Sequence, residues 1–376
     1  MKKKKKILIY ADKPSWAYDN IGKAVAEDLS DVADFYFDYC CCHLYYLDSE
    51  SFFLKFKRDI HRTIKNLMSF FRPDNLFDWN YRFIGHKFIP FWIKEFTYNS
   101  RKYERKVLPP WKSYDVILYF DFYFDRYASL NKNGKKIIKG IYTDSFPPEC
   151  LELDYKTLRS GDQINFNINK HAFFRKYFEG VDVIACGSNN LIKEFKSIPK
   201  KKLFLNYLRD ENKFLPKEKD YFKKLVVGWT GNPNRNFKNY YSLIVPAIEF
   251  LNQEGLDIEL KSRFEGPFDT LPQFYDDVHV IIIASVADSG PSMFAEAALS
   301  GIPAISTKVG FANYVISDGA NGFFIAPTLN DLIEMLKTLY FDRESLIRAS
   351  NLIRNSYLKK MGNSILLKNW FNAFEL

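Results

Sequence analysis

The sequence has few cysteines and no long apolar run. Five cysteines occur among 376 residues, three of them consecutive at Cys40, Cys41 and Cys42, and this pattern fits neither a disulfide framework nor a zinc site. No window comes near the roughly 18 uninterrupted apolar residues that can cross a bilayer. The initial lysines precede an apolar stretch, 7–11, that Asp12 ends too early for a signal peptide. We therefore expect a cytoplasmic protein that is not integral to a membrane.

Motifs of several cofactor and nucleic-acid classes are also missing. No G-x-G-x-x-G fingerprint is present, which argues against a bound dinucleotide. No group of His, Asp and Cys has the spacing of metal ligands, and none of the five histidines lies in a recognisable site. No RNA-binding or DNA-binding motif occurs. We expect no cofactor, no bound metal and no nucleic-acid partner.

Apolar and aromatic residues, by contrast, are plentiful. Hydrophobic residues make up 47% of the chain and aromatic residues 18%, which indicates a well-packed globular protein. The length favours two domains. We expect an N-terminal domain over 1–212, a polar linker over 213–224, a C-terminal domain over 225–361, and a helix over 362–376 that is able to pack back across the first domain.

Short apolar runs bounded by Gly, Asp or Ser recur in both halves, as is typical of strands buried on both faces of a parallel sheet. Helical spacing lies between them, at 20–29 with Asn20 as N-cap, at 240–252 and at 292–299. The alternation predicts an α/β protein with two Rossmann-like domains. The expected strands are 7–11, 32–37, 115–120, 136–142, 181–186, 225–230, 257–261, 278–284 and 304–307.

The most informative stretch is 286–307, VADSGPSMFAEAALSGIPAIST, which follows an expected strand. Gly290 allows the backbone to approach a ligand closely, and a helix that begins near Ser292 directs free N–H groups and its positive end at an anion. Glu296, in the first turns of that helix, can accept hydrogen bonds from a ribose diol. On spacing alone, a plain strand, loop and helix with solvated carboxylates remains an open alternative.

This stretch resembles the signature of two acidic residues separated by seven others in the retaining glycosyltransferases of family 4, which have the GT-B fold. Asp288 and Glu296 stand at the two acidic positions, although the family usually has Glu followed by Gly where this chain has Asp288 and Ser289. The resemblance implies that the chain grips a nucleotide diphosphate sugar through this loop. The donor-binding residues that it implies are Ser289, Gly290, Pro291, Ser292 and Met293.

A second segment, 228–239 (GWTGNPNRNFKN), resembles the loop with which that family clamps the donor diphosphate. Arg235 and Lys238 match its cationic positions, and Gly231 and Asn232 lie in the same loop. A bidentate guanidinium and an ammonium stabilise a leaving diphosphate without a metal. The resemblance covers roughly 181–326 and implies two Rossmann-like domains that face a cleft.

The first domain offers weaker candidates. The family often has a His at the end of a strand close to the donor's anomeric carbon, and here the segment GIYTDSFPP places Asp144 near that position. Asp144 is equally well explained as a turn-initiating residue. Ser15 and Trp16 follow the first strand, at the edge where open α/β sheets bind ligands, so they are candidates for contact with the diphosphate or the acceptor. Packing of Trp16 on the rim of its own domain is the alternative.

The segment 51–114 carries 14 Lys and Arg against 5 Asp and Glu, interleaved with Phe, Trp and Tyr, and so holds the whole net charge of +9. Cations alternating with aromatic anchors are typical of surfaces that bind anionic membranes. We expect an anionic membrane surface or a lipid-linked acceptor as its partner, at the inner face of the membrane. An ordinary packed helical insertion is the alternative.

Taken together, the sequence and the resemblance predict a metal-independent, hexosyltransferase-like enzyme. Its expected reaction moves a sugar, with retention, from a nucleotide diphosphate sugar to a saccharide or lipid-linked saccharide, in cell-surface polysaccharide or glycoconjugate synthesis. Two alternatives stay open: a nucleotide-sugar epimerase, and a catalytically inactive relative that binds a membrane or a partner protein.

Overall fold

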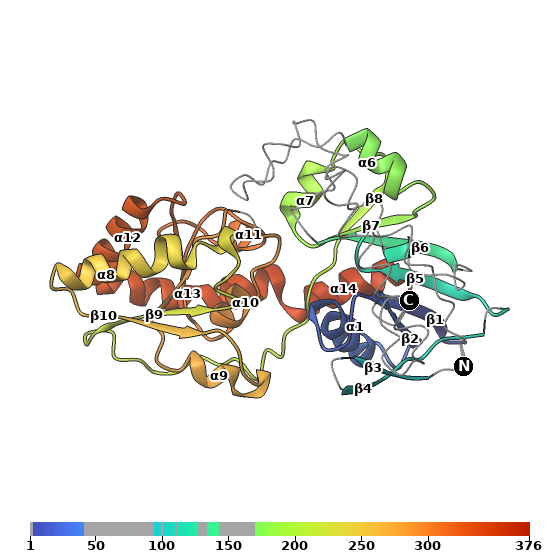
Figure 1. The fold of residues 1–376 in the computed structure, drawn as a ribbon, viewed down its shortest axis with the longest axis horizontal. Helices are drawn as coiled ribbons and strands as arrows, with labels where there is room; N and C mark the ends of the chain where they lie inside the picture. The colour runs from blue at the N-terminus through green and yellow to red at the C-terminus, as the bar shows by residue number, and fades with distance from the viewer. Residues whose placement is uncertain are drawn as a thin grey trace, which may run out of the picture. The chain divides into compact units, whose positions relative to one another are not determined.

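The structure is a computed structural model that describes residues 3–40, 94–98, 101–109, 111–122, 124–126, 134–142, 170–286 and 288–376. The chain divides into two compact units. The first comprises residues 1–141, 177–185 and 371–376, and the second comprises residues 142–176 and 186–370. Each unit is built on strands and helices that alternate along the chain (Figure 1). The predicted α/β class is confirmed.

A six-stranded sheet with the order β2-β1-β5-β6-β7-β8 forms the centre of the N-terminal half. Strands β2, β1, β5 and β6 pair in parallel. The central strand β1 is buried along 7–11, with at most 1% of each residue exposed, because helices cover both faces of such sheets. The strands are β1 (Lys5–Ala11), β2 (Ala33–Tyr39), β5 (Tyr114–Tyr119), β6 (Gly134–Ile141), β7 (Val183–Cys186) and β8 (Lys201–Phe204).

A five-stranded parallel sheet with the order β10-β9-β11-β12-β13 forms the core of the second unit. Its strands are β9 (Leu225–Thr230), β10 (Ile258–Arg263), β11 (Val280–Ile283), β12 (Ala304–Ser306) and β13 (Phe323–Phe324). The predicted strand 225–230 and the predicted helix 292–299 have the bounds that the sequence indicated. Strands β8 and β13 were not predicted, since β8 (KKLF) begins with two lysines and β13 has only two residues.

The helices that accompany these strands differ from the prediction in two places. Helix α1 (Ala17–Asp28) begins at Ala17 with Trp16 as N-cap, so the assignment of Asn20 as N-cap was wrong. Asp19 in the first turn accepts the Ser15 N–H at 2.7 Å, which allows the helix to start earlier. The other described helices are α6 (Lys170–Tyr177), α7 (Asn189–Glu194), α8 (Val245–Gln253), α9 (Leu271–Phe274), α10 (Ser292–Leu299), α11 (Ala312–Val315), α12 (Leu329–Phe341), α13 (Arg343–Met361) and α14 (Asn363–Phe374).

The second difference is in the predicted helix 240–252. Its first five residues form the π-helix η6 (Tyr240–Ile244), and α8 follows. Pro246 has no N–H to donate to the carbonyl four residues earlier, so the regular α-helical ladder is interrupted there. A 3-10 turn, η5 (Asn236–Lys238), precedes η6 and ends at Asn239, whose φ of 56° is left-handed.

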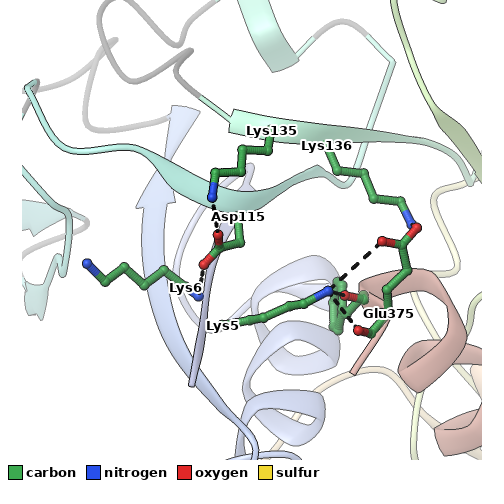
Figure 2. Close-up of polar contacts among 7 residues, drawn as sticks. Lys5, Lys6, Asp115, Lys135, Lys136 and Glu375 are labelled. Carbon is green, nitrogen blue, oxygen red and sulfur yellow. Dashed lines mark hydrogen bonds and ion pairs between the residues drawn. The ribbon is translucent and has the colours of Figure 1, made fainter. Parts of the chain in front are cut away.

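The last residues of the chain belong to the first unit. Figure 2 shows two lysines, Lys5 on β1 and Lys136 on β6, directed at Glu375. Lys5 Nζ donates to the carbonyl of Glu375 at 2.7 Å, and Phe374 packs its ring against Phe35 at 6.0 Å between centroids. A second cluster in Figure 2 joins Asp115 to the backbone N–H of Lys6 at 3.0 Å and to Lys135 Nζ at 3.2 Å. These contacts hold the C-terminus at the edge where β1, β5 and β6 begin.

Of the basic aromatic segment 51–114, residues 94–98, 101–109 and 111–114 are described. They include an antiparallel pair, β3 (Glu95–Tyr98) and β4 (Arg101–Glu104). Arg105 is buried and forms a bidentate ion pair with Asp38, at 2.6 Å from Nε and 3.1 Å from Nη2. One of the fourteen cations in this segment is therefore structural.

Candidate functional site

The loop between β11 and α10 brings two predicted site residues together. Lys238, at the end of η5, places its Nζ 2.7 Å from Asp288 Oδ2, and the other oxygen of Asp288 accepts the Gly290 N–H at 3.2 Å. The side chain of Lys238 is 21% exposed and that of Asp288 13%, so the pair is shielded but within reach of a ligand. An ammonium retains further N–H donors after pairing once. Lys238 can therefore hold Asp288 and a phosphate oxygen together.

The turn that carries Lys238 is fixed by its neighbours in the same unit. The Asn239 amide donates to the Ala284 carbonyl at 2.8 Å, and the Val286 N–H donates to the Phe237 carbonyl at 3.0 Å. These bonds attach the turn to the end of β11. Lys238 and Asp288 meet because the segment after β9 is bonded to the segment after β11. Both segments lie at the carboxyl edge of the sheet, where parallel sheets bind ligands.

Three other predicted residues belong to the same β9 loop. Gly231 has a φ of 145° and its N–H donates to the Arg263 carbonyl, so the chain turns sharply there. Arg235 is the exposed N-cap of η5, and no ion pair joins it to a carboxylate in the described part of the chain. Asn232 is exposed beside it, with its Oδ1 accepting the Asn234 N–H. The structure brings Lys238, but not Arg235, to Asp288.

Helix α10 begins beside this pair with Pro291 as N-cap and no side chain that caps it. Ser289 and Gly290 are partly exposed and Ser292 is exposed, whereas Pro291 and Met293 are buried. The positive end of α10 and the N–H groups of its first two residues, Ser292 and Met293, therefore lie four and five residues along the chain from Asp288, which suits an anion. Gly310, with a φ of 47°, packs against this loop so closely that a Cβ there would clash with the Asp288 carbonyl.

Glu296 lies on the same helix but deeper, with 4% of the residue exposed. Tyr275 donates its hydroxyl proton to Oε2 at 3.0 Å, and Arg209 Nη2 lies 3.6 Å from Oε1. Burial raises the pKa of the Glu296 carboxyl, and the Arg209 charge opposes that rise. The carboxylate is oriented from both sides, and its remaining lone pairs can accept further hydrogen bonds.

Arg209 and Tyr275 were not among the predicted site residues. Arg209 lies five residues after the end of β8. Tyr275 follows the short helix α9. Neither residue has a local pattern that distinguishes it from a surface side chain, and their relation to Glu296 depends on the fold.

Of the first unit's candidates, Ser15 and Trp16 stand at the start of α1. Ser15 has a left-handed φ of 56° that its N–H bond to Asp19 supports. Trp16 is 46% exposed, and Lys13 Nζ lies 3.7 Å from the centroid of its ring. This cation–π contact places a partly exposed, positively charged group at the carboxyl end of β1.

Two further carboxyls at this edge were missed, Asp12 after β1 and Asp121 after β5. Burial raises the pKa of Asp121 to about 7 and that of Asp12 to about 6. Asp121 accepts from the Phe122 N–H at 2.8 Å and from the Tyr18 hydroxyl at 3.2 Å, and the Asp12 charge raises its pKa further. A proton is therefore held here close to neutral pH. Both residues directly follow predicted strands, which is the signal that could have found them.

Asp144 lies outside the described residues. Within the described ranges, no group of three or more His, Cys, Asp and Glu side chains is placed to hold a metal ion. In the same ranges, no helix combines the length and apolar character needed to cross a bilayer. The predictions of metal independence and of membrane association stay predictions.

Comparison with known proteins finds a family match within the second unit. Residues 215–342 match the family model described as Glycosyl transferases group 1. This range includes Lys238, Asp288 and Glu296 and begins six residues after Arg209. A comparison with the curated proteins gave no match.

Solved structures resemble the whole chain in fold. Sucrose-phosphate synthase from Thermosynechococcus elongatus has a TM-score of 0.63 at 10% identity and covers 99% of this chain and 98% of its own. TarM has a TM-score of 0.62 at 9% identity with 99% of both chains covered, and Anabaena HepE in complex with UDP-glucose has 0.56 at 14% identity, with 99% and 100% covered. Residues 215–342 thus match the glycosyl transferases group 1 family model, and the chain as a whole has the fold of the GT-B glycosyltransferases.

Proposed function

We propose that the chain transfers a sugar from a nucleotide diphosphate sugar to a hydroxyl of a saccharide or lipid-linked saccharide. The observation that carries this proposal is the Lys238–Asp288 ion pair at 2.7 Å beside the uncapped start of α10, with Glu296 on the same helix. Two of the solved structures support the donor class, since HepE was solved with UDP-glucose and a mutant of S. aureus TarM, of which this chain covers 55%, was solved with UDP.

Each residue has a distinct part in the proposed reaction. Glu296 accepts hydrogen bonds from the ribose, Asp288 accepts from a hydroxyl of the donor sugar, and Lys238 and the N–H groups of α10 bind the diphosphate. The bond between the anomeric carbon and the diphosphate oxygen breaks as the acceptor oxygen bonds to that carbon. The acceptor proton passes to the departing phosphate oxygen. Lys238 and α10 stabilise the negative charge that develops there.

Transfer with retention follows if the acceptor attacks on the face that the diphosphate leaves, and such a step needs no protein nucleophile. The diphosphate already has cationic and backbone partners, so we propose that no metal is required. We further propose synthesis of cell-surface polysaccharide or glycoconjugate at the cytoplasmic face of a membrane, on the charge and aromatic content of segment 51–114.

Titration calorimetry with UDP and with a panel of nucleotide sugars tests the donor site. A charge-assisted hydrogen bond is worth about 1.5 to 3 kcal/mol, so Lys238→Ala and Glu296→Gln are each expected to weaken binding of the true donor roughly tenfold to a hundredfold. The Gln variant is chosen because it keeps the shape of the side chain and one oxygen, which can face Arg209 or accept from Tyr275, while it removes the charge and replaces the other oxygen with a donor.

Lys223→Ala is the matched control. Lys223 is 80% exposed and precedes β9, so it lies at the opposite edge of the same sheet from Lys238. Equal donor affinity in the parent, the Lys238 variant and this control would remove Lys238 from the site. Absence of binding by every nucleotide sugar in the parent would reject the transferase and favour an inactive relative.

A further inference from the structure

Arg209 is held in the second unit by backbone contacts that fix the direction of its side chain. Its N–H donates to Asn363 Oδ1 at 3.1 Å, and the Asn363 amide donates back to the Arg209 carbonyl at 2.6 Å. Two residues on, Arg354 donates to the Glu211 carbonyl at 2.9 Å. The segment that carries Arg209 is thus attached to the starting residue of α14 and to α13.

The guanidinium of Arg209 is buried, with 5% of the residue exposed, yet it is incompletely paired. Nη2 faces Glu296 Oε1 at 3.6 Å, and the ring of Tyr207 covers one face of the guanidinium, 3.7 Å from Cζ to the ring centroid. The Nε–H is buried and finds no hydrogen-bond acceptor among the side chains and backbone of the described residues. Buried donors of this kind are rare and usually mark a missing partner.

The geometry points to that partner: we propose that Arg209 binds the ribose of the nucleotide donor, its Nε–H donating to a hydroxyl whose own proton goes to Glu296. This inference rests on the proposed function, because it adds Arg209 to the same donor site. A hydroxyl both donates and accepts, whereas an ionised carboxylate only accepts and a guanidinium only donates. Arg209 and Glu296 together complement a vicinal diol in a way that Glu296 alone does not.

The stacked ring of Tyr207 strengthens this assignment. It occupies the face of the guanidinium and leaves the in-plane edge, on which Nε–H and the two terminal nitrogens lie, for hydrogen bonds. Nη2 on that plane is directed at Glu296, and Tyr275 holds the other carboxylate oxygen. A ligand hydroxyl beside Glu296 is therefore the acceptor that satisfies Nε–H without breaking either contact.

The test compares UDP with 2′-deoxy-UDP and 3′-deoxy-UDP by titration calorimetry on the full chain. In the parent, loss of the bound hydroxyl is expected to weaken binding tenfold or more, because it leaves the Arg209 donor unpaired again. In Arg209→Met, UDP is expected to bind at least tenfold more weakly, and the penalty for the deoxy analogue is expected to fall below threefold. Arg348→Met, which removes an exposed guanidinium bonded to Ser345 Oγ, is the control and is expected to change neither value.

Arg209→Lys separates direct binding from a role through Glu296. Lysine keeps a positive charge near the carboxylate but has no Nε–H, so the loss of hydroxyl discrimination is expected to persist. Full recovery of UDP affinity and of discrimination in the lysine variant would overturn the proposal, as would an unchanged deoxy penalty in the methionine variant.

A measurement on the parent keeps the inference falsifiable if the variants fold poorly. Saturation with UDP is expected to shift one buried arginine Nε–H resonance in a nitrogen-15 correlation spectrum and to slow its exchange with water. Bound UDP with no such change would reject Arg209 as a ligand residue while leaving the proposed function intact. Failure of the parent to bind UDP or any other nucleoside diphosphate would reject the proposed function itself.

Discussion

Replacement of Asp121 by Asn should make the protein more stable at pH 8 than the parent, but not at low pH. Asp121 is 4% exposed, and burial raises its pKa from 3.8 to about 7. Because this pKa is higher in the folded than in the unfolded chain, the carboxyl destabilises the fold as pH rises from about 4, and the cost is complete above pH 7. At 1.36 kcal/mol for each pKa unit, the cost at pH 8 is at most about 4 kcal/mol.

Asparagine keeps the local hydrogen bonds while removing the charge. Its carbonyl oxygen can accept the Phe122 N–H, and its amide can donate to the Tyr18 oxygen. The assay is thermal unfolding of parent and variant at pH 5 and pH 8. For a domain of 150–250 residues, 1 kcal/mol corresponds to about 2–4 °C in Tm. We expect the advantage of the variant to grow by several degrees between the two pH values.

Asp115→Asn is the control in the same sheet. Burial acts to raise the pKa of Asp115, but hydrogen bonds from the Lys6 N–H and Lys135 outweigh it, so the pKa lies below 3.8. The stability that this group provides is present above pH 3.8 and is lost only as pH falls through the lowered pKa, so its effect is the same at pH 5 and pH 8. If the difference in Tm between the Asp121 variant and the parent is likewise the same at pH 5 and pH 8, the Asp121 carboxyl is ionised at both pH values. The argument that burial raises its pKa is then wrong.

Two predictions concern the metal and the membrane. Transfer activity is expected to survive a chelator, because Lys238 and the start of α10 supply the charge that a metal would supply, and loss of activity with rescue by magnesium or manganese would contradict this. The chain is also expected to sediment with anionic vesicles, and changing Lys55, Lys57, Arg58 and Arg62 to serine, all outside the described residues, removes about 4 kcal/mol of attraction at about 1 kcal/mol each. If that variant and the parent sediment equally, segment 51–114 has a structural role and does not bind the membrane. The matched control changes four exposed lysines of the second unit to serine and is expected to sediment like the parent; they are Lys217, Lys223, Lys308 and Lys359.

The sequence by itself determined the features that depend on near neighbours in the chain. Apolar runs bounded by turn residues predicted the buried strands, and the spacing in 292–299 predicted α10 with its observed bounds. Asp288, Glu296 and Lys238 were singled out by resemblance to family motifs, and Asp288 and Lys238 lie in segments that follow predicted strands. Pro246 is visible in the sequence as well. The sequence does not show, however, that the five residues of η6 form a π-helix before it, because that depends on the hydrogen bonds of the folded backbone.

Tertiary structure decided which of these residues meet and how each is charged. Arg209, Tyr275 and Glu296 come from three separate parts of the chain, which meet only in the folded second unit. Likewise, Asp12 and Asp121 are ordinary carboxylates in the sequence, and only the neighbouring placement of β1 and β5 buries them together and raises their pKa values. Periodicity is a local property, whereas burial and ion pairing depend on atoms contributed by distant parts of the chain.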